Sequence, residues 1–357
     1  MTVFTTATFV GVRARCCAPC RYWLLLPDTD FEACRNPART TSYRRSAGLP
    51  HPARARVTTS RTSYRQLARE IIARCLLWSG VIRVMRVLLW RDRVLILVYH
   101  DPKPDVLKSH LRYLCRIADP VGLRDLHKTS NGRPRVVITI DDGHAGNAAL
   151  LEVFAAYGIR PTIYLCSCIA GTRRQFWWQH GPLGAKGVER LKRLRNVERL
   201  SELRAFGFSQ DDEHDPPAAL SRSDIGCMQG RVDFQSHGRF HPILTCCDDE
   251  ECRREIAQSR REVERLAGNE CRHFAYPNGN YGAREVAVLR CAGYRTARTL
   301  DLGWNGPGCD PFRLKAVAVS DDSSIPWFAL QVSLLPAYAR YLRHGSLFGR
   351  APQFRSP

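Results

Sequence analysis

The stretch RVVITIDDGHAGN, residues 135–147, joins an apolar run to a cluster of polar residues. Its segment VVITI, residues 136–140, consists of β-branched residues and is typical of a strand buried on both faces of a parallel sheet. Asp141 and Asp142 follow where this strand is expected to end. In α/β folds, ligands and catalytic groups gather at the carboxyl ends of the strands. Asp-Asp-Gly also suits an ordinary turn, so this stretch alone leaves both interpretations open.

The segments on both sides of this strand alternate between strand and helix patterns. Apolar runs predict strands at residues 94–98 and 161–165, and helical spacing predicts helices at residues 107–117 and 148–157. Strand, helix and strand in this order form parallel βαβ units, so the predicted fold class is α/β. Further elements of the same two kinds are expected downstream, at residues 248–267, 274–277 and 284–299.

The rest of the chain divides by composition. Residues 1–64 hold scattered Pro, Thr and Arg without a sustained period, so we expect a disordered or non-native N-terminal extension, with an organellar transit peptide as an alternative. Residues 65–93 are expected to form a basic amphipathic helical segment that bends or splits at Ser79-Gly80. The α/β domain is placed at residues 94–330, and a C-terminal helix and tail at residues 331–357.

Composition and charge limit the classes of partner. The chain has 357 residues, of which 44% are hydrophobic and 9% aromatic, as in globular proteins. Its formal net charge is +20, and residues 1–65 supply +8 of it through eleven Arg and three acids. No helix-turn-helix signature, aromatic RNA-binding motif or Cys/His finger accompanies this charge. We therefore expect no nucleic-acid partner.

Cysteine usage and hydropathy bear on the compartment. The fifteen cysteines include a single CxxC, Cys17 to Cys20, and their spacings do not repeat, so reduced thiols are expected. No stretch reaches the roughly 18 to 20 apolar residues of a membrane span, and Arg13 and Arg15 interrupt any secretory signal. A bacterial cytoplasmic location is expected. The basic helix at residues 65–91 either lies on an anionic membrane surface or packs on its own domain.

A pair of histidines follows another predicted strand, in VDFQSHGRFHPIL, residues 232–244. His237 and His241 are four residues apart, so one helical turn would place both imidazoles on the same side. Two histidines and one carboxylate form a common ligand set for a catalytic divalent metal, and Asp142 is the candidate carboxylate. Neighbouring side chains in extended backbone point to opposite sides, so Asp141 would face the activated water as general base. An isolated HxxxH also occurs as two surface or core histidines.

Two further features complete the candidate site. In RHFAYPNGNYG, residues 272–282, an X-Pro-Asn-Gly loop follows a short strand, and its N–H groups could form an oxyanion hole or simply a turn. The long excursion at residues 170–220 carries Trp177 and Trp178, which suit stacking on sugar rings or ordinary packing.

Together these stretches resemble the NodB-homology polysaccharide deacetylases, carbohydrate esterase family four, over roughly residues 66–325. The motifs that carry the resemblance are Tyr99-His100, TIDDG at 139–143, SHGRFH at 236–241 and FAYP at 274–277. The segments ILVYH…SHLRYL and DPFRL are similar to the subgroup associated with exopolysaccharide biosynthesis.

The resemblance implies a distorted (β/α)7 barrel of the TIM-like NodB type, one divalent metal ion, and removal of N-acetyl groups from an amino-sugar polymer or oligomer. Zinc is the expected ion, with cobalt, nickel and manganese as alternatives. The implied metal ligands are Asp142, His237 and His241, and the implied catalytic residues are Asp141 as base with Asn278 and His144. The expected substrate-binding residues are Tyr276, Pro277, Trp177 and Trp178.

The chain departs from the family pattern at three places. Gly238 stands where Ser or Thr is usual, which removes a hydroxyl from the histidine loop. Ala275 occupies the place of an Arg that partners the base, so Arg272 or Arg313 is expected to replace it.

The third departure concerns the general acid. No LxH motif follows residue 300, and His144 and Asp321 are the candidates for protonating the leaving amine. Two other functions remain open: a metal-assisted amidase for a small amide or cyclic imide, and a non-catalytic glycan-binding barrel.

Overall fold

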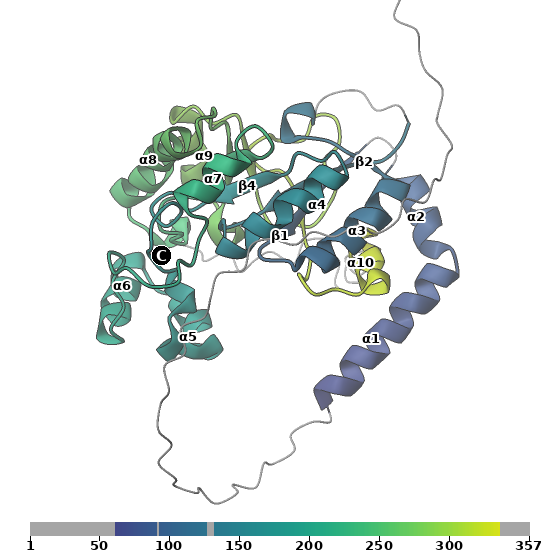
Figure 1. The fold of residues 1–357 in the computed structure, drawn as a ribbon, viewed down its shortest axis with the longest axis horizontal. Coiled ribbons are helices and arrows are strands. Elements are labelled where there is room, and N and C mark those ends of the chain that lie inside the picture. The colour runs from purple at the N-terminus through teal and green to yellow at the C-terminus, as the bar shows by residue number, and fades with distance from the viewer. Residues whose placement is uncertain (1–60, 91–92, 127–131, 336–357) are drawn as a thin grey trace, which may run out of the picture. The chain divides into compact units, whose positions relative to one another are not determined.

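A computed structural model describes residues 61–90, 93–126 and 132–335. Its centre is a sheet of strands (Figure 1). Every pairing in this sheet is parallel, and the strand order is β7-β6-β5-β4-β3-β1-β8. A short additional strand, β2, pairs with β3 beside this path. The strands are β1 Val94–Tyr99, β2 Asp119–Pro120, β3 Arg135–Ile140, β4 Thr162–Leu165, β5 Asp233–Ser236, β6 His273–Ala275, β7 Thr296–Arg298 and β8 Val317–Ala318.

The two ends of this strand order are brought together by one segment. Leu314 forms a parallel bridge with Arg298 at the end of β7, and three residues later β8 pairs with β1. The sheet therefore curls into a distorted barrel, which confirms the predicted fold class.

The burial of β1 explains why the side chains on both faces of these strands are apolar. All six of its residues are buried, and they alternate between two hydrophobic clusters. Ile96 and Val98 belong to a cluster built mainly from strand residues, on the inner face of the sheet. Leu95 and Leu97 belong to the larger cluster that the surrounding helices cover. Burial on both faces is the reason that the strand reads as a continuous apolar run.

Helices surround the strands (Figure 1). Those that pack along the sheet are α3 Pro104–Ile117, α4 Leu151–Ala156, α7 Arg222–Met228, α8 Asp249–Ala267 and α9 Ala283–Cys291. α8 matches its prediction closely: Asp248 caps its first turn by accepting a hydrogen bond from the Glu251 N–H, and Gly268 ends it in the left-handed conformation. α5 Gly184–Leu191 and α6 Asn196–Ala205 lie in the predicted excursion and have a small core of their own.

Three more helices form a group at one side of the barrel: α1 Arg61–Trp78, α2 Val81–Leu89 and α10 Ile325–Val332. The break between α1 and α2 confirms the split predicted at Ser79-Gly80, and Gly80 has a left-handed φ of 76°. α1 begins four residues before the predicted start of this segment; the rest of the proposed N-terminal extension, residues 1–60, lies outside the described residues. Helix α10 begins at Ile325, before the C-terminal helix predicted from residue 331. Residues 336–357 also lie outside the described residues.

Two global properties complete the fold. Within the described ranges, no helix has both the length and the hydropathy needed to cross a membrane. The eleven cysteines in these ranges have free thiols.

Candidate metal and active site

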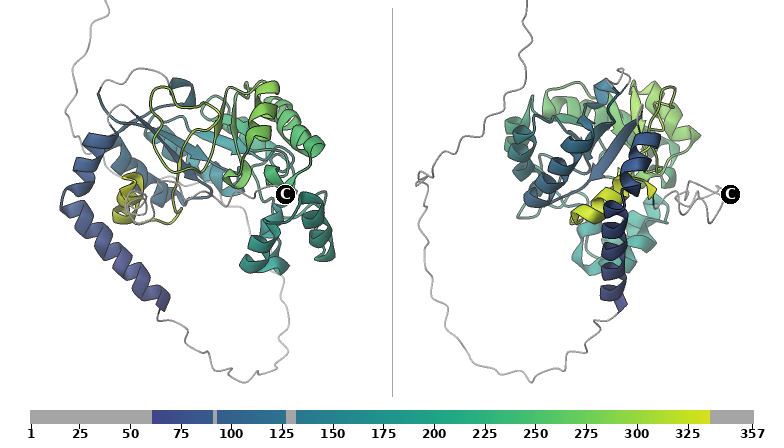
Figure 2. Two further views of the ribbon diagram at one scale, coloured as in Figure 1. Left: turned by 180° about the vertical axis from the view of Figure 1, so that it is seen from behind. Right: turned by 90° about the vertical axis from the view of Figure 1, so that its right-hand side faces the viewer.

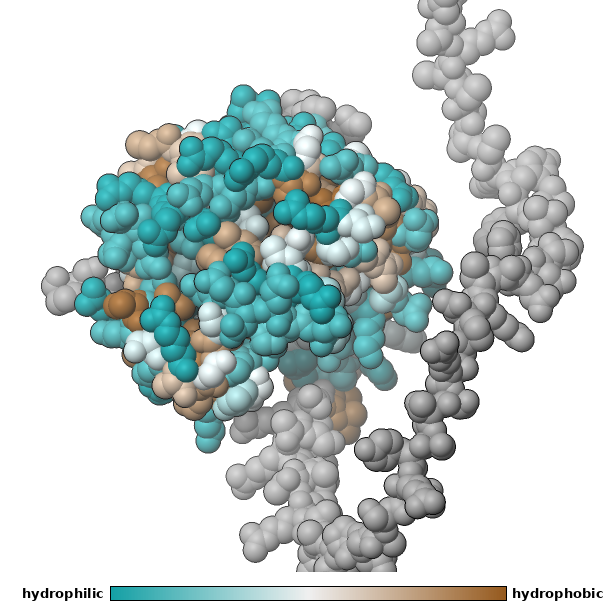
Figure 3. All heavy atoms as spheres, turned by 60° about the vertical axis from the view of Figure 1, so that its left-hand side comes forward, coloured by the Kyte–Doolittle hydropathy of each residue, from teal (hydrophilic) through white to brown (hydrophobic). Residues whose placement is uncertain are grey.

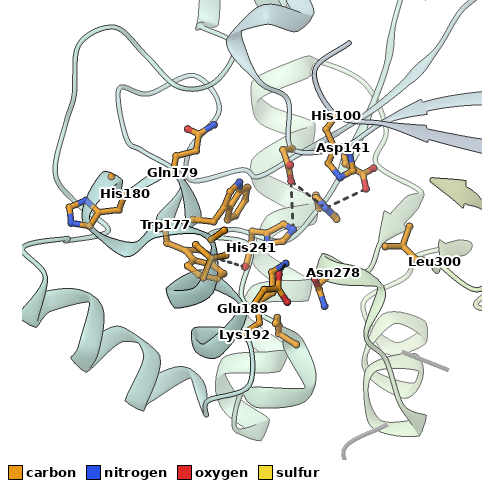
Figure 4. Close-up of a pocket in the computed structure, with 18 residues that line it drawn as sticks. His100, Asp141, Trp177, Gln179, His180, Glu189, Lys192, His241, Asn278 and Leu300 are labelled. Atoms are coloured by element: carbon orange, nitrogen blue, oxygen red, sulfur yellow. Dashed lines mark hydrogen bonds and ion pairs between the residues drawn. The ribbon is translucent and has the colours of Figure 1, made fainter. Parts of the chain in front are cut away.

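Three side chains from two loops meet at the carboxyl end of the sheet (Figure 4). Asp142 follows β3, and His237 and His241 follow β5. The Nε2 atoms of His237 and His241 lie 3.5 Å and 3.6 Å from the Oδ1 atom of Asp142. One ligand atom from each of the three residues falls within 4.8 Å of the others. The structure therefore brings together the three residues predicted as metal ligands.

The backbone at Asp142 explains how both neighbouring carboxylates reach the site. Asp142 has a left-handed φ of 69°, so the prediction of extended backbone here was wrong. The turn directs both acids to the same side: the Oδ2 atom of Asp141 is 3.7 Å from the Nε2 atom of His237. Gly143 continues the turn with φ +75°, and a Cβ there would come within 2.5 Å of Leu165. Glycine is therefore needed at this position.

The two histidines come together through a loop, and not through the helical turn that their spacing predicted. Gly238 has φ +81° and His241 has φ 55°, both in the left-handed region. The Glu255 side chain, on α8, holds this loop because its Oε2 atom accepts hydrogen bonds from the N–H groups of Arg239 and Phe240, at 2.7 Å and 3.2 Å. Carboxylate-to-backbone bonds of this kind favour the curled path of the loop over a helix.

Gly238 and Glu255 fit each other. A Cβ at position 238 would lie 3.3 Å from Oε2 of Glu255, so a larger residue there would crowd the carboxylate. The histidine loop, which has no hydroxyl at Gly238, is thus held by an acid from another element. Burial raises the pKa of Glu255 to about 7, although the two backbone hydrogen bonds act in the opposite direction. Sequence reasoning missed Glu255 because it is one of many charged residues in α8.

The buried donor atoms fit a divalent cation. His237 donates from Nδ1 to the carbonyl oxygen of Ala275 at 2.8 Å, so its Nε2 lone pair faces Asp142. Within the described ranges, Oδ1 of Asp142 is buried without a hydrogen-bond partner. Ligands bound to zinc at 2.0 to 2.1 Å in a tetrahedron lie about 3.4 Å apart, close to the separations of Oδ1 from the two Nε2 atoms. The residues present therefore suit a zinc-like ion.

The charge states of the ligands are also suitable. Burial would raise the pKa of Asp142, but the hydrogen bond from His144 and the nearby His241 and His237 hold it well below its usual range. Burial lowers the pKa of His241 to about 3, which keeps its imidazole neutral. Metals bind ionised carboxylates and neutral imidazoles.

Asp141 forms a buried ion pair with Arg298, which ends β7. The Arg298 guanidinium donates to both carboxylate oxygens of Asp141, at 2.6 Å and 2.5 Å. The predicted partners were wrong because each pairs elsewhere: Arg272 contacts Glu270, and Arg313 lies 3.5 Å from an oxygen of Asp310. The available sequence signal was an arginine inside a short strand, where a buried charge requires a partner.

Neither predicted general acid lines the pocket. His144 is buried, and its Nε2 atom lies 3.2 Å from Oδ2 of Asp142. Burial would lower the pKa of His144, but this hydrogen bond and the charge of Asp142 raise it, so His144 is a donor that orients Asp142. Asp321 accepts hydrogen bonds from the backbone N–H groups of His100 and Asp101. It thereby fixes the loop after β1, and His100 from this loop does line the pocket.

The pocket beside the three ligands has a volume of about 530 Å³. The α5 segment and the turn before it form one wall, which includes Trp177 and Glu189 (Figure 4). Trp178 and Val188 also line the pocket. Trp177 is buried and donates from Nε1 to the carbonyl oxygen of His241 at 3.3 Å. The half-buried ring of Trp178 lies 4.4 Å from that of His241, centroid to centroid.

The third predicted loop contributes only one of its residues to the pocket. Asn278 lines it, with φ 56° and with its Nδ2 donating to Asn280 at 2.6 Å. Tyr276 and Pro277, predicted to bind substrate, are buried and are not among the lining residues. Tyr276 instead stabilises the fold, since its hydroxyl donates to the carbonyl oxygen of Phe312 at 3.1 Å.

Comparisons with known proteins agree with this architecture. Residues 128–297 match the polysaccharide deacetylase family model. The Streptococcus pyogenes deacetylase PplD in complex with acetate shares 14% identity and a TM-score of 0.50, covering 68% of this chain and 98% of that one. IcaB from Ammonifex degensii shares 18% identity and a TM-score of 0.51, covering 69% and 99%. These two likenesses show the fold, and no curated protein gives a significant match.

The family match includes both acids, both histidines and the Asn278 loop. With these residues at one end of a barrel of the same fold, residues 128–297 of the chain are similar to the polysaccharide deacetylase family.

Proposed function

We propose that this protein is a metal-dependent hydrolase that removes N-acetyl groups from an amino-sugar polysaccharide or oligosaccharide. One observation carries the proposal: the Asp142, His237 and His241 ligand set opens into the same pocket as Asp141, whose carboxylate Arg298 holds in place. This arrangement combines a metal site with a positioned base, which hydrolysis of an unactivated amide requires.

In this proposal, Asp142, His237 and His241 hold one divalent ion, with zinc favoured and cobalt, nickel and manganese as alternatives. A bound ion of this kind lowers the pKa of a water ligand to about 7 and polarises an acyl oxygen. His144 keeps Asp142 oriented, and Ala275 fixes the tautomer of His237.

Asp141 acts as the general base and takes a proton from the attacking water. Water oxygen bonds to the acyl carbon, the C–N bond breaks, and acetate leaves as the sugar amine takes up a proton. Arg298 keeps the Asp141 carboxylate in one orientation. Asn278 lines the same pocket, and we assign to its N–H groups the binding of the acyl oxygen.

We assign the proton donor for the leaving amine to His100. It lines the pocket at the end occupied by Asp141, and Asp321 anchors its backbone (Figure 4). His180 also lines the pocket, but its Nε2 atom bonds to the carbonyl oxygen of Phe206 at 2.8 Å. An imidazole side chain is a common proton donor in catalysis.

The pocket supports an amino sugar as substrate. Its volume of about 530 Å³ has room for a saccharide unit, and the Trp178 ring offers an apolar face for stacking. Trp177, by contrast, is almost fully buried and supports His241.

The test compares Asp141→Asn with wild type, both loaded with metal, for acetate release from N-acetylhexosamine oligomers. Asparagine keeps the size of the side chain and can accept one hydrogen bond from Arg298, but it cannot act as a base. We expect the variant to retain its metal and to lose about 10²-fold or more in rate. Wild-type protein that releases no acetate from any such oligomer would overturn the proposal. Glycan binding without release, unchanged by a chelator, would indicate the non-catalytic glycan-binding barrel instead.

A further inference from the structure

Large exposed hydrophobic residues are concentrated on α1 and α2. Ten such residues occur in the described ranges, and eight of them lie between residues 67 and 88. Trp78 is 91% exposed and Leu88 is 71% exposed. By contrast, the face drawn in Figure 3 is mostly hydrophilic, with hydrophobic residues in small groups. The eight residues are Leu67, Ile71, Ile72, Trp78, Val81, Val84, Val87 and Leu88, and we call them the α1–α2 face.

The opposite side of these helices is attached to the barrel. Ala73 and Ile82 are buried in a cluster with residues of α10, which lies between these helices and the sheet (Figures 1 and 2). The Arg69 guanidinium lies 3.8 Å from the ring centre of Trp327, and the Ser324 hydroxyl donates to Glu70 at 2.5 Å. The barrel therefore holds both helices by one side, and the α1–α2 face is not needed for that attachment.

Helical geometry arranges the exposed residues in rows. Leu67, Ile71 and Trp78 are spaced by four and seven residues, so they share one side of α1, and Arg74 lies in the same row. Val81, Val84 and Leu88 form the equivalent row on α2. Two amphipathic helices thus present apolar rows to solvent. Monomeric soluble proteins rarely expose large contiguous apolar patches.

The charges on this segment indicate what would cover it. Arg74 is exposed within the row on α1, Arg83 is exposed beside the row on α2, and Arg86 is half-buried. The single acid between residues 67 and 88 is Glu70, which is bonded to Ser324 on the barrel side. An anionic bilayer surface attracts arginines that flank buried apolar side chains.

We propose that the α1–α2 face docks the protein on an anionic lipid surface, with its apolar rows in the interface and its arginines at the phosphate groups. Neither helix crosses the membrane in this arrangement, in agreement with their length and hydropathy. The proposal does not depend on the proposed catalytic function.

The experiment is co-sedimentation of the full chain with phosphatidylcholine vesicles that either contain or lack phosphatidylglycerol. We expect wild type to bind the anionic vesicles only, and the double variant Trp78→Glu/Leu88→Glu to bind at least about tenfold more weakly. Arg74→Glu/Arg83→Glu changes only exposed charges, and it should also lose binding to the anionic vesicles. Val197→Glu on α6 is the matched control, because Val197 is 63% exposed and lies outside the α1–α2 face. This variant should bind the vesicles as wild type does.

Two results would overturn the proposal. One is equal sedimentation of wild type and both double variants. The other is a dimer in solution, measured by light scattering, that Trp78→Glu/Leu88→Glu converts to monomer while no form binds vesicles; this would assign the α1–α2 face to a second copy of the chain.

Discussion

Asp141 and Asp142 are neighbours in the chain, but their carboxylates have different partners. Both oxygens of Asp141 accept hydrogen bonds from Arg298. Asp142 accepts one from His144 on Oδ2, which leaves Oδ1 facing the two histidines. This difference in contacts, more than the order of the residues, divides the proposed work between a base and a metal ligand.

The Arg298 contact gives a direct prediction. Arg298→Lys keeps the buried charge but loses the planar guanidinium, whose Nη2 atom bonds both oxygens of Asp141. We expect kcat for acetate release to fall by about 10²-fold because the base is no longer fixed, while metal content stays unchanged. Arg313→Lys is the matched control, since Arg313 pairs with Asp310 away from the base and should retain wild-type kcat. Equal rates in both variants would contradict this function of Arg298.

Glu255 is predicted to set the metal affinity through the histidine loop. Glu255→Gln weakens the acceptor of the Arg239 and Phe240 N–H groups, so the position of His241 becomes less defined. We expect a loss of metal affinity of about tenfold or more, measured by competition with a chromophoric chelator. Glu262→Gln, on the same helix, alters contacts to the side chains of Arg239, Ser167 and Cys168 but leaves the backbone bonds of Glu255 in place, and it should bind metal as wild type. Unchanged affinity in Glu255→Gln would disprove this prediction.

Glu255 also makes stability depend on pH. Its pKa is raised from 4.5 in the unfolded chain to about 7 in the folded protein, mainly by burial. Between these values the folded state binds the additional proton, so the stabilisation is complete in acid and is lost as pH rises toward 7. The free energy of unfolding of metal-free wild type should therefore fall relative to Glu255→Gln across this range, by denaturant titration at several pH values.

Glu262 provides the control for this pH dependence. Burial would raise its pKa, but hydrogen bonds from Arg239 and Ser167 hold it below its usual range. Its contribution is therefore present above pH 4.5 and is lost only in stronger acid, so Glu262→Gln should run parallel to wild type from about pH 5 to about pH 7.5. Parallel curves for Glu255→Gln as well would show that Glu255 does not titrate in this range.

At the scale of elements, the excursion at residues 170–220, which contains α5 and α6, forms one wall of the pocket. It packs on its own small core and places Trp178 beside His241. Trp178→Ala should raise KM for an N-acetylated oligosaccharide by a few-fold to about tenfold, since a stacking face is lost. Trp178→Phe retains a ring and should recover most of the affinity, with metal content equal in all forms. A fall in kcat with unchanged KM would contradict a substrate-stacking function.

Sequence predicted the regular elements better than the loops between them. The strands β1, β3 and β4 were predictable because both faces are buried, which leaves a continuous apolar run. The path of the loop from His237 to His241 was not, because it depends on Glu255 from a distant helix. The left-handed backbone at Asp142 was also missed, since φ above zero is uncommon outside glycine.

At the scale of the whole molecule, strand order decides which distant residues meet. Asp142 and His237 were predictable as partners because each follows a strand, and strands β3 and β5 both pair with β4. Arg298 reaches Asp141 only because the barrel curls, bringing the end of β7 toward β3 across the interior. No local pattern encodes that approach, so the sequence predicts Arg272 or Arg313 as the partner of Asp141.

The most direct test of the central claim is acetate release from an N-acetylhexosamine oligomer by metal-free full-length protein titrated with zinc. We predict that the rate is negligible without metal, rises in proportion to added zinc, and levels off at about one ion per chain. Release at full rate without metal, or no release at any ratio, would contradict the assignment of Asp142, His237 and His241 as the metal site of a deacetylase.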